Sequence, residues 1–207
     1  MEFLQRRHWV FDLDGTLTKP VHDFDQIRAH LGLPAGVGTL EGLAHVPEAE
    51  REACIAKLNQ IGWEYALMSE IQDGVRAFLD ELVAAGCRLG VVTRNNRPNL
   101  DESLRRIACE DLFPSEVRLS RDDPPAKPAP DPIQRLLRLW EASADDAVMV
   151  GDAIYDLQAG RAAGAATLYL DPAGDGPHGA WADGRFSCWK ALGELRRSGM
   201  VERGRPA

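Results

Sequence analysis

Two aspartates, Asp12 and Asp14, stand one residue apart directly after the apolar residues 9–11. Side chains alternate between the two faces of a strand, so both carboxylates point the same way as far as strand geometry lasts. At 4 Å two such anions repel by about 4 kcal/mol if the effective dielectric constant is near 20. A fold tolerates this when a cation lies between the carboxylates or when one of them stays protonated. The pair therefore predicts a metal site or an acid–base pair.

The same pair also fits an ordinary polar turn, because Asp-x-Asp-Gly is a common pattern. Thr93 and Asp152 stand in equivalent positions, however, since each follows a short apolar segment. Strands that alternate with helices predict a Rossmann-like α/β fold, with a mostly parallel sheet and helices on both faces. Ligands bind such sheets at the carboxyl ends of the strands. We therefore expect Asp12, Thr93 and Asp152 to face one crevice.

The elements that must position these residues follow from the periodicity of the apolar side chains. Strands are expected at residues 8–11, 89–92, 116–119, 147–150 and 167–170, and helices at residues 75–85, 100–107, 132–140, 154–163 and 189–195. Asp73 is predicted as the N-cap of the first of these helices, and Asp152 as the N-cap of the helix that begins at Ile154.

Residues 19–72 show helical patterns only and interrupt the alternation of strands and helices. Their longest helix is expected at residues 47–69, with a proline in its first turn. We interpret this segment as an all-helical cap inserted into an α/β core formed by residues 1–18 and 73–207.

The cap is expected to set specificity, and Lys57 or Arg51 are the side chains that could reach down toward the core. The histidines at positions 22, 30 and 45 are predicted to be surface or packing residues rather than ligands. A cap that closes over a crevice excludes water and bulk, which favours a small-molecule substrate over a protein substrate.

Four polar clusters occur in order along the core. They are Asp12-Leu13-Asp14-Gly15-Thr16, Val91-Val92-Thr93-Arg94-Asn95, Lys127-Pro128 and Gly151-Asp152-Ala153-Ile154-Tyr155-Asp156. This ordered set resembles the four signature motifs of the haloacid dehalogenase-like hydrolase superfamily, over residues 10–164. The helical insertion between the first two motifs resembles the phosphoglycolate-phosphatase-like branch, which carries a helical cap there.

The resemblance and the residue chemistry point to the same reaction. Phosphoryl transfer needs an in-line nucleophile and neutralisation of the phosphoryl oxygens. A carboxylate can form an aspartyl-phosphate, which assigns the nucleophile to Asp12. Asp14 can protonate the leaving oxygen and later deprotonate the attacking water. This role requires a protonated Asp14, so its pKa is expected to be raised by its like-charged neighbours.

A hard divalent cation such as Mg²⁺ takes one or two carboxylates together with phosphate and water. The resemblance assigns it to the Asp12 carboxylate, the Asp14 backbone carbonyl and the Asp152 carboxylate. Asp156 lies one helical turn beyond Asp152 and is expected to hold a metal-bound water or to fix Lys127.

The remaining motif residues are expected to handle the phosphate group. Thr93 offers a hydroxyl group, and Lys127 supplies the positive charge that complements the transferred group. Gly15 permits a turn that brings backbone amides near the phosphate, and Thr16 supports that turn. Arg94 is assigned to substrate or phosphate binding, although it and the neighbouring Asn95 could instead line the loop.

Two other functions stay open. A sugar phosphomutase keeps the same acids and differs in how its cap excludes water, but the insertion is short for that role. A catalytically inert phosphate-binding protein would be expected to lack one of the four motif residues, and none is missing. The dehalogenase and phosphonate-cleaving branches lack an acid at the position of Asp14, so phosphate-ester chemistry is favoured.

The amino-acid composition limits the possible partners and the cellular location of the protein. With 207 residues and a formal net charge of −8, the chain is unsuited to nonspecific nucleic-acid binding. No apolar run approaches the length of a membrane span, and no signal peptide is visible. The four cysteines show no short Cys-x-x-Cys spacing, which favours reduced thiols and a cytoplasmic location. Nothing in the sequence indicates an oligomeric state.

Overall fold

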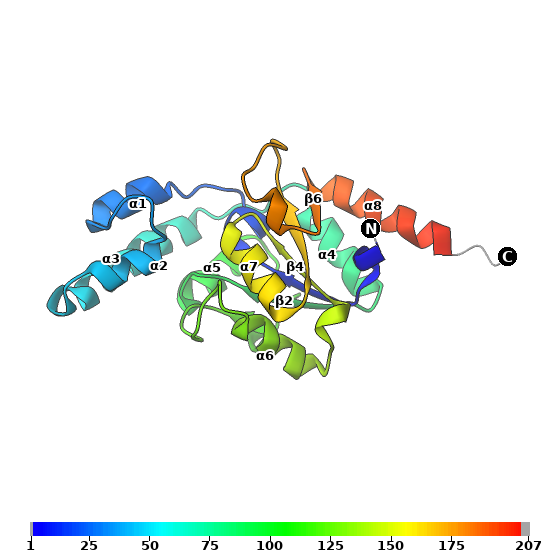
Figure 1. Cartoon of the computed structure of the whole chain (residues 1–207), viewed down its shortest axis with the longest axis horizontal. Helices are drawn as coiled ribbons and strands as arrows, with labels where there is room; N and C mark the ends of the chain where they lie inside the picture. The colour runs from blue at the N-terminus through cyan, green and yellow to red at the C-terminus, as the bar shows by residue number, and fades with distance from the viewer. Residues whose placement is uncertain (1, 204–207) are drawn as a thin grey trace.

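A six-stranded sheet forms the centre of the computed structural model, which describes residues 2–203 (Figure 1). The strands lie in the order β3-β2-β1-β4-β5-β6, and every neighbouring pair is parallel. Their bounds are β1 His8–Phe11, β2 Arg88–Val92, β3 Arg118–Leu119, β4 Ala147–Gly151, β5 Ala166–Leu170 and β6 Gly184–Phe186. The predicted Rossmann-like α/β fold is confirmed.

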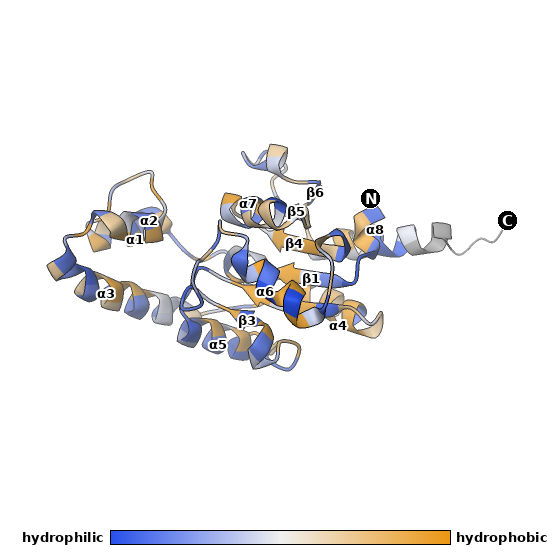
Figure 2. Ribbon diagram, turned by 60° about the horizontal axis from the view of Figure 1, so that its bottom comes forward, coloured by the Kyte–Doolittle hydropathy of each residue, from blue (hydrophilic) through white to orange (hydrophobic). Residues whose placement is uncertain are grey.

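In the described part of the chain, eight α-helices surround this sheet or extend from it (Figure 1). Their bounds are α1 Phe24–Leu31, α2 Thr39–Gly42, α3 Glu48–Leu67, α4 Val75–Ala84, α5 Arg97–Arg106, α6 Asp131–Trp140, α7 Ile154–Ala163 and α8 Trp189–Arg203. The central strands β1 and β4 are mainly hydrophobic, whereas the helices carry both hydrophobic and hydrophilic residues (Figure 2).

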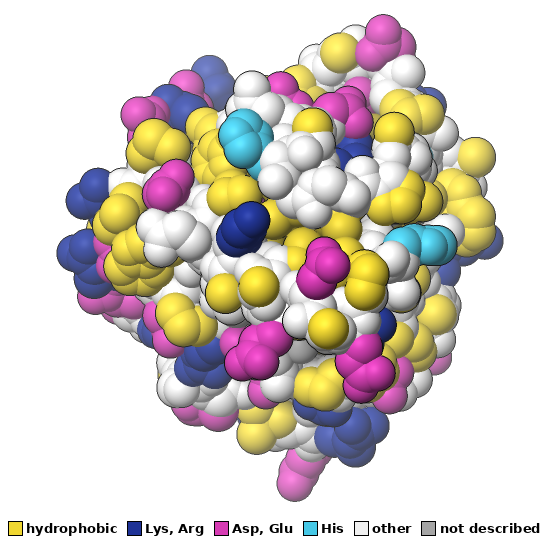
Figure 3. All heavy atoms as spheres, turned by 90° about the vertical axis from the view of Figure 1, so that its left-hand side faces the viewer, with side chains coloured by type: hydrophobic (Ala, Val, Ile, Leu, Met, Phe, Trp, Pro, Cys, Tyr) yellow, Lys and Arg dark blue, Asp and Glu magenta, His cyan; other side chains and the backbone are white. Residues whose placement is uncertain are grey.

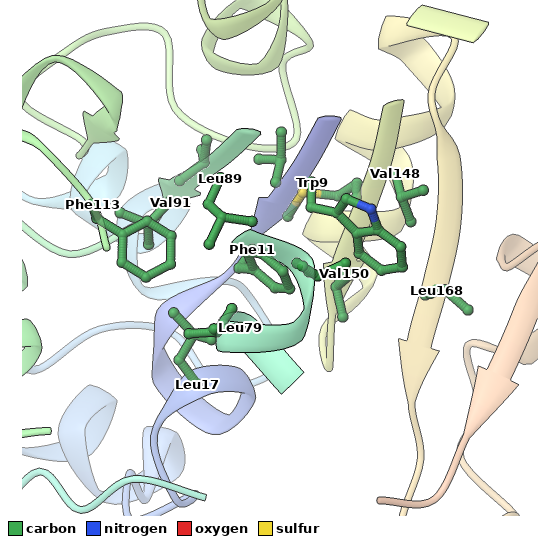
Figure 4. Close-up of a cluster of buried hydrophobic side chains, with 14 of the residues drawn as sticks. Trp9, Phe11, Leu17, Leu79, Leu89, Val91, Phe113, Val148, Val150 and Leu168 are labelled. Atoms are coloured by element: carbon green, nitrogen blue, oxygen red, sulfur yellow. The ribbon is translucent and has the colours of Figure 1, made fainter. Parts of the chain in front are cut away.

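The central strand β1 packs against helices on both faces of the sheet. Trp9 contacts Phe78 of α4 edge-on, with ring centroids 5.5 Å apart, and the Phe11 ring lies 6.0 Å from the Trp189 ring of α8. On the other face, His8 stacks on Trp140 of α6 at 5.5 Å. Figure 4 shows this buried cluster, in which Trp9 and Phe11 lie among side chains from neighbouring strands and from α4. A parallel sheet buried on both faces fits such continuous apolar strands.

Helices α1, α2 and α3 lie together at one end of the molecule, beyond the edge of the sheet (Figure 1). Two neighbouring chain segments connect them to the core. Thr18 pairs with Ile71 in an isolated antiparallel bridge, and the Lys19 backbone N–H donates to the Glu70 carbonyl at 2.9 Å. We propose this paired stem as the boundary between the core and the cap; the predicted bounds of the insertion, residues 19–72, stay a prediction.

Two predicted caps and one strand require correction. Helix α4 begins after Gly74, which has a left-handed φ of 88°, and Asp73 does not cap it. The N-cap of α7 is Ala153, whose N–H donates to Asp156, so Asp152 is free to face the crevice. Strand β6 was not expected, because its three residues lack a continuous apolar run.

Candidate active site

A cavity of about 470 Å³ lies between the cap helices and the carboxyl ends of β1, β2 and β4. Its core side is lined by Asp12, Asp14, Thr93, Lys127 and Asp152. Asp12 directly follows β1, Thr93 directly follows β2, and Asp152 directly follows β4. The parallel topology thus gathers residues that are far apart in sequence at one edge of the sheet.

Lys127 is almost completely buried. Its side chain is 1% exposed, and its Nζ lies 2.5 Å from Asp12 Oδ1 and 2.6 Å from Asp156 Oδ1. Burial alone would lower the pKa of Lys127, but the two carboxylates outweigh it, so the pKa is raised. Lys127 is therefore a fixed cation beside Asp12.

Asp156 holds Lys127 from the start of α7. Its Oδ2 accepts a hydrogen bond from the Ala153 backbone N–H at 3.0 Å while its Oδ1 pairs with Lys127. Burial and the charge of Asp12 raise the pKa of Asp156 to about 6, against the opposing effect of Lys127. Of the two roles expected for Asp156, the geometry matches the fixing of Lys127.

Asp14 lies in an irregular turn, Leu13–Leu17, that follows β1. Its Oδ2 accepts from Asn95 Nδ2 at 3.3 Å and lies 3.5 Å from Thr93 Oγ1, while His22 Nε2 lies 3.9 Å from Oδ1. Burial raises the pKa of Asp14; His22 opposes this rise, and the charge of Asp12 adds to it. The direction agrees with the protonated Asp14 expected from the sequence.

Asp152 completes the acidic floor of the cavity. Its Oδ1 accepts from Thr16 Oγ1 at 2.9 Å. Burial, followed by the charges of Asp12 and Asp156, raises the pKa of Asp152 well above its ordinary value. Thr16 is fully buried and ties the first motif to the fourth.

Carboxylate oxygens of Asp12, Asp152 and Asp156 lie within 4.8 Å of one another. Lys127 pairs with Asp12 and Asp156, so one cation faces three carboxylates, and Asp152 accepts a hydrogen bond from the neutral Thr16 hydroxyl. Buried anions without a partner are costly, and oxygen ligands of this kind suit a hard divalent cation. The residues present therefore fit a divalent metal ion.

Gly15 allows the first motif to approach Asp152. Its φ is +84°, and a Cβ built on it would overlap the Asp152 carboxylate.

We expect Gly15→Ala to lower the free energy of unfolding by about 1–2 kcal/mol through the left-handed backbone alone. Displacement of Asp152 should also weaken the binding of a divalent cation, which calorimetry with Mg²⁺ can measure. Gly86→Ala is the control, because Gly86 also has a positive φ but open space around it. Equal Mg²⁺ affinity in the two variants would contradict the role of Gly15.

Arg94 connects the core to the cap. Its Nη2 pairs with Glu41 in α2 at 2.6 Å, its Nη1 donates to the Lys127 carbonyl at 2.6 Å, and its guanidinium lies 3.8 Å from the centre of the Tyr155 ring. The side chain lines the cavity, but these partners already occupy it. Its binding of substrate stays a prediction.

The cap residues proposed from the sequence are not those that face the cavity. Lys57 and Arg51 are exposed, and the Arg51 guanidinium donates to the Val46 carbonyl on the cap itself. Arg28 of the cap and Arg121 of the core line the cavity instead. The expectation that Lys57 or Arg51 reaches the site was therefore wrong.

His22 packs against the Phe24 and Tyr65 rings, as expected for a packing residue, yet it also faces Asp14. Sequence reasoning missed this second role. The only available signal was its place in the linker, ten residues after Asp12. His30 and His45 are exposed, as predicted.

Known proteins resemble this chain in sequence and in structure. The sequence is 32% identical over 180 residues to a haloacid dehalogenase-like hydrolase domain-containing protein of Arabidopsis thaliana, covering 80% of this chain and 71% of that protein. It is 28% identical over 174 residues to the pyrophosphatase PpaX of Bacillus cereus strain Q1, covering 76% and 80% of the two chains.

Among solved structures, the fold superposes with a TM-score of 0.75 on a predicted phosphoglycolate phosphatase from Haemophilus somnus 129PT. The match covers 92% of this chain and 98% of that one at 22% sequence identity, which shows the shared fold. The family model described as haloacid dehalogenase-like hydrolase matches residues 7–164, which include all four motifs. The chain belongs to the haloacid dehalogenase-like hydrolase family.

Proposed function

We propose that this hydrolase is a Mg²⁺-dependent phosphatase, which cleaves a small phosphorylated metabolite through an aspartyl-phosphate on Asp12. The observation that carries the proposal is the placement of Asp12 in the cavity, with one carboxylate oxygen held by the buried Lys127. The similar proteins described above include a pyrophosphatase and a predicted phosphoglycolate phosphatase, and their names support phosphate chemistry.

In the first half of the proposed reaction, an Asp12 oxygen attacks the phosphorus atom and the bond from phosphorus to the ester oxygen breaks. Asp14, kept protonated by burial, donates its proton to the departing oxygen. The free alcohol leaves, and the phosphoryl group stays on Asp12.

In the second half, a water molecule attacks the phosphorus atom of the phosphoenzyme. Asp14, now ionised, takes a proton from that water, and the Asp12 carboxylate is released together with inorganic phosphate. Atoms and protons balance over the cycle, since Asp14 regains the proton that it gave to the alcohol.

Thr93 and Lys127 are proposed to bind the phosphoryl oxygens. The Thr93 hydroxyl accepts from the Asn95 backbone N–H at 3.0 Å, which orients it beside Asp14. Lys127 acts as a fixed positive charge because Asp12 and Asp156 hold its Nζ from two sides.

The Asp12 and Asp152 carboxylates and the Asp14 backbone carbonyl are the proposed ligands of Mg²⁺. Asp156 is not among the proposed metal ligands, because its carboxylate pairs with Lys127. When bound, the cation would compensate the acidic floor and the charge of the phosphoryl oxygens.

Replacement of Asp14 by asparagine tests the proposed proton transfer. We expect kcat to fall by about 10²–10⁴-fold, the range typical of a lost general acid–base. In the wild type, activity should fall as the pH rises through the raised pKa of Asp14, because the proton donor is then lost. The pH profile of kcat for Asp14→Asn should lack this descending limb. An unchanged profile in the variant would refute the assignment.

The decisive experiment is a panel of phosphate esters assayed with Mg²⁺ and with a chelator. Release of inorganic phosphate that depends on Mg²⁺ would support the proposal. Absence of turnover on the whole panel would contradict it. A requirement for a sugar bisphosphate activator would instead indicate the phosphomutase alternative.

We further propose a cytoplasmic setting with no nucleic-acid partner. Within residues 2–203 none of the four cysteines forms a disulfide, and the formal net charge of −8 repels nucleic acid. In the same part of the chain, no helix combines the length and hydrophobicity that crossing a bilayer requires.

A further inference from the structure

Arg121 lies on the loop after β3 and lines the cavity from the core side. Its backbone N–H donates to the Asn95 carbonyl at 2.9 Å, so the loop is anchored beside the motif that contains Thr93. Its Nη2 donates to the side-chain oxygen of Asn59 on the cap helix α3. The side chain therefore extends from the core to the cap along the wall of the cavity.

The charge of Arg121 sets it apart from the other arginines that line the cavity. Arg28 is paired with Asp25, and Arg94 is paired with Glu41. Within residues 2–203, no carboxylate lies within 4 Å of the Arg121 guanidinium, and its one side-chain partner is the neutral Asn59 amide. Burial lowers the pKa of Arg121, and the charge of the neighbouring Asp122, whose carboxylate accepts from the Arg97 backbone N–H, only partly offsets this effect.

A guanidinium in such a place favours the binding of an anion. Charge-assisted hydrogen bonds to carboxylate or phosphate are stronger than bonds to a neutral amide, and guanidinium matches both groups geometrically. The substrate phosphate itself already has Lys127 and Thr93 on the floor of the cavity. A second anionic group on the substrate is the partner that Arg121 lacks.

The cavity around Arg121 also indicates the size and polarity of the leaving group of the substrate. A cavity of about 470 Å³ falls within the range of small-molecule pockets and is larger than a phosphate group needs. Apolar side chains from the cap line much of it: Phe24, Ile27, Leu40, Leu58 and Ile61. These residues favour a leaving group with an apolar or flat portion.

We propose that Arg121 is a specificity residue that binds a second anionic group, a carboxylate or a second phosphate, on the leaving group of the phosphate ester. Asn59 holds the guanidinium in place, so that the cap helix α3 orients the arginine without neutralising it. This assignment rests on the proposed phosphatase function and adds the charge and polarity of its substrate.

The test compares substrates that differ in one charge. The 3- and 4-isomers of carboxyphenyl phosphate are each paired with the carbamoylphenyl phosphate of nearly the same shape, and phenylene bisphosphate probes the second-phosphate case. In the wild type, kcat/KM should favour the member that carries the second anionic group by about 10- to 100-fold, the effect of one hydrogen bond to a charged group. A preference for carboxylate or for phosphate identifies which anion the site takes.

Three variants separate charge from packing. Arg121→Met should remove the preference for the anionic ester while leaving kcat/KM for the amide ester within a few-fold of wild type. Arg121→Gln keeps a donor for Asn59 and should lose the preference in the same way. Lys57→Met removes an exposed cation from helix α3, which also carries Asn59, and should keep the preference. An unchanged ratio in both Arg121 variants would overturn the proposal, and so would equal rates for both esters in the wild type.

Binding measurements keep this inference distinct from the phosphatase proposal. If the wild type hydrolyses none of these esters, the phosphatase proposal loses its support, and calorimetry with the corresponding carboxyphenyl and carbamoylphenyl phosphonates decides the role of Arg121. Tighter binding of the carboxylate that disappears in Arg121→Met supports the assignment. Equal affinity of the two phosphonates for the wild type refutes it.

Discussion

Replacing Asp12 by asparagine is expected to reduce turnover of phosphate esters by about 10⁴-fold or more, because an amide cannot form the phosphoenzyme. Asparagine has nearly the same shape and can still accept a hydrogen bond from Lys127, so the fold should survive. Steady-state phosphate release measures the loss. Acid quenching during turnover should trap labelled phosphate on the wild type and none on the variant.

The control for this experiment is Asp146→Asn. Asp146 immediately precedes β4, at the opposite end of the strand from Asp152, and its carboxylate pairs with Arg7 at 3.1 Å. Loss of that partly exposed pair should leave turnover within a few-fold of wild type. Substantial turnover by Asp12→Asn, in a preparation free of wild-type enzyme, would exclude Asp12 as the nucleophile.

Replacing Lys127 by methionine is expected to affect both stability and activity. Methionine fills a similar volume but leaves Asp12 and Asp156 buried without a cation. Breaking a buried ion pair by removing one partner costs about 3–5 kcal/mol, so the free energy of unfolding should fall by that amount in the absence of metal. Turnover should be lost as well, because the fixed charge beside the nucleophile is gone.

A second substitution separates these two effects. In Lys127→Met with Asp156→Leu, the unpaired Asp156 carboxylate is also removed, so part of the lost stability should return. Turnover should stay as low as in the single variant, since nothing replaces the charge beside Asp12. Denaturant unfolding and phosphate release together give the result. Recovery of both properties would mean that Lys127 acts through stability alone.

The residues that directly follow the strands were the part of the site that the sequence predicted best. Apolar segments with the length of strands placed Asp12, Thr93 and Asp152 at carboxyl ends, and the rule for parallel sheets then brought them to one crevice. The structure does bring them together around one cavity. Their chemical roles stay predictions, because proximity does not establish catalysis.

The cavity walls could not be predicted in the same way. Arg121 lies on a loop, and its direction depends on contacts with Asn95 and Asn59 rather than on any local period. Lys57 was expected to reach the site because of its charge, but its place on α3 points it to solvent. Which face of a cap helix looks inward is decided by packing against the core, and a single sequence does not specify that packing.

The mixed character of the cap surface explains why the inward side of its helices could not be predicted. Figure 3 views the molecule from the cap end, where hydrophobic side chains lie among acidic, basic and histidine side chains. Trp63 and Leu67 of α3, and Met68 directly after it, are each more than a third exposed. Helix α3 is therefore not cleanly amphipathic, and its pattern alone cannot distinguish the side facing the cavity from the side facing water.

The stem between core and cap also carries a side chain that ties the two mechanically. Gln72, at the end of the cap segment, donates through Nε2 to two carbonyls: that of Gly15, which directly follows Asp14, and that of Thr18, which directly follows the turn. A swing of the cap about this stem would pull on the peptide next to the proton donor. We therefore expect the orientation of Asp14, the proposed proton donor, to depend on the position of the cap, so that the proposed reactive groups are fully aligned only when the cap is closed.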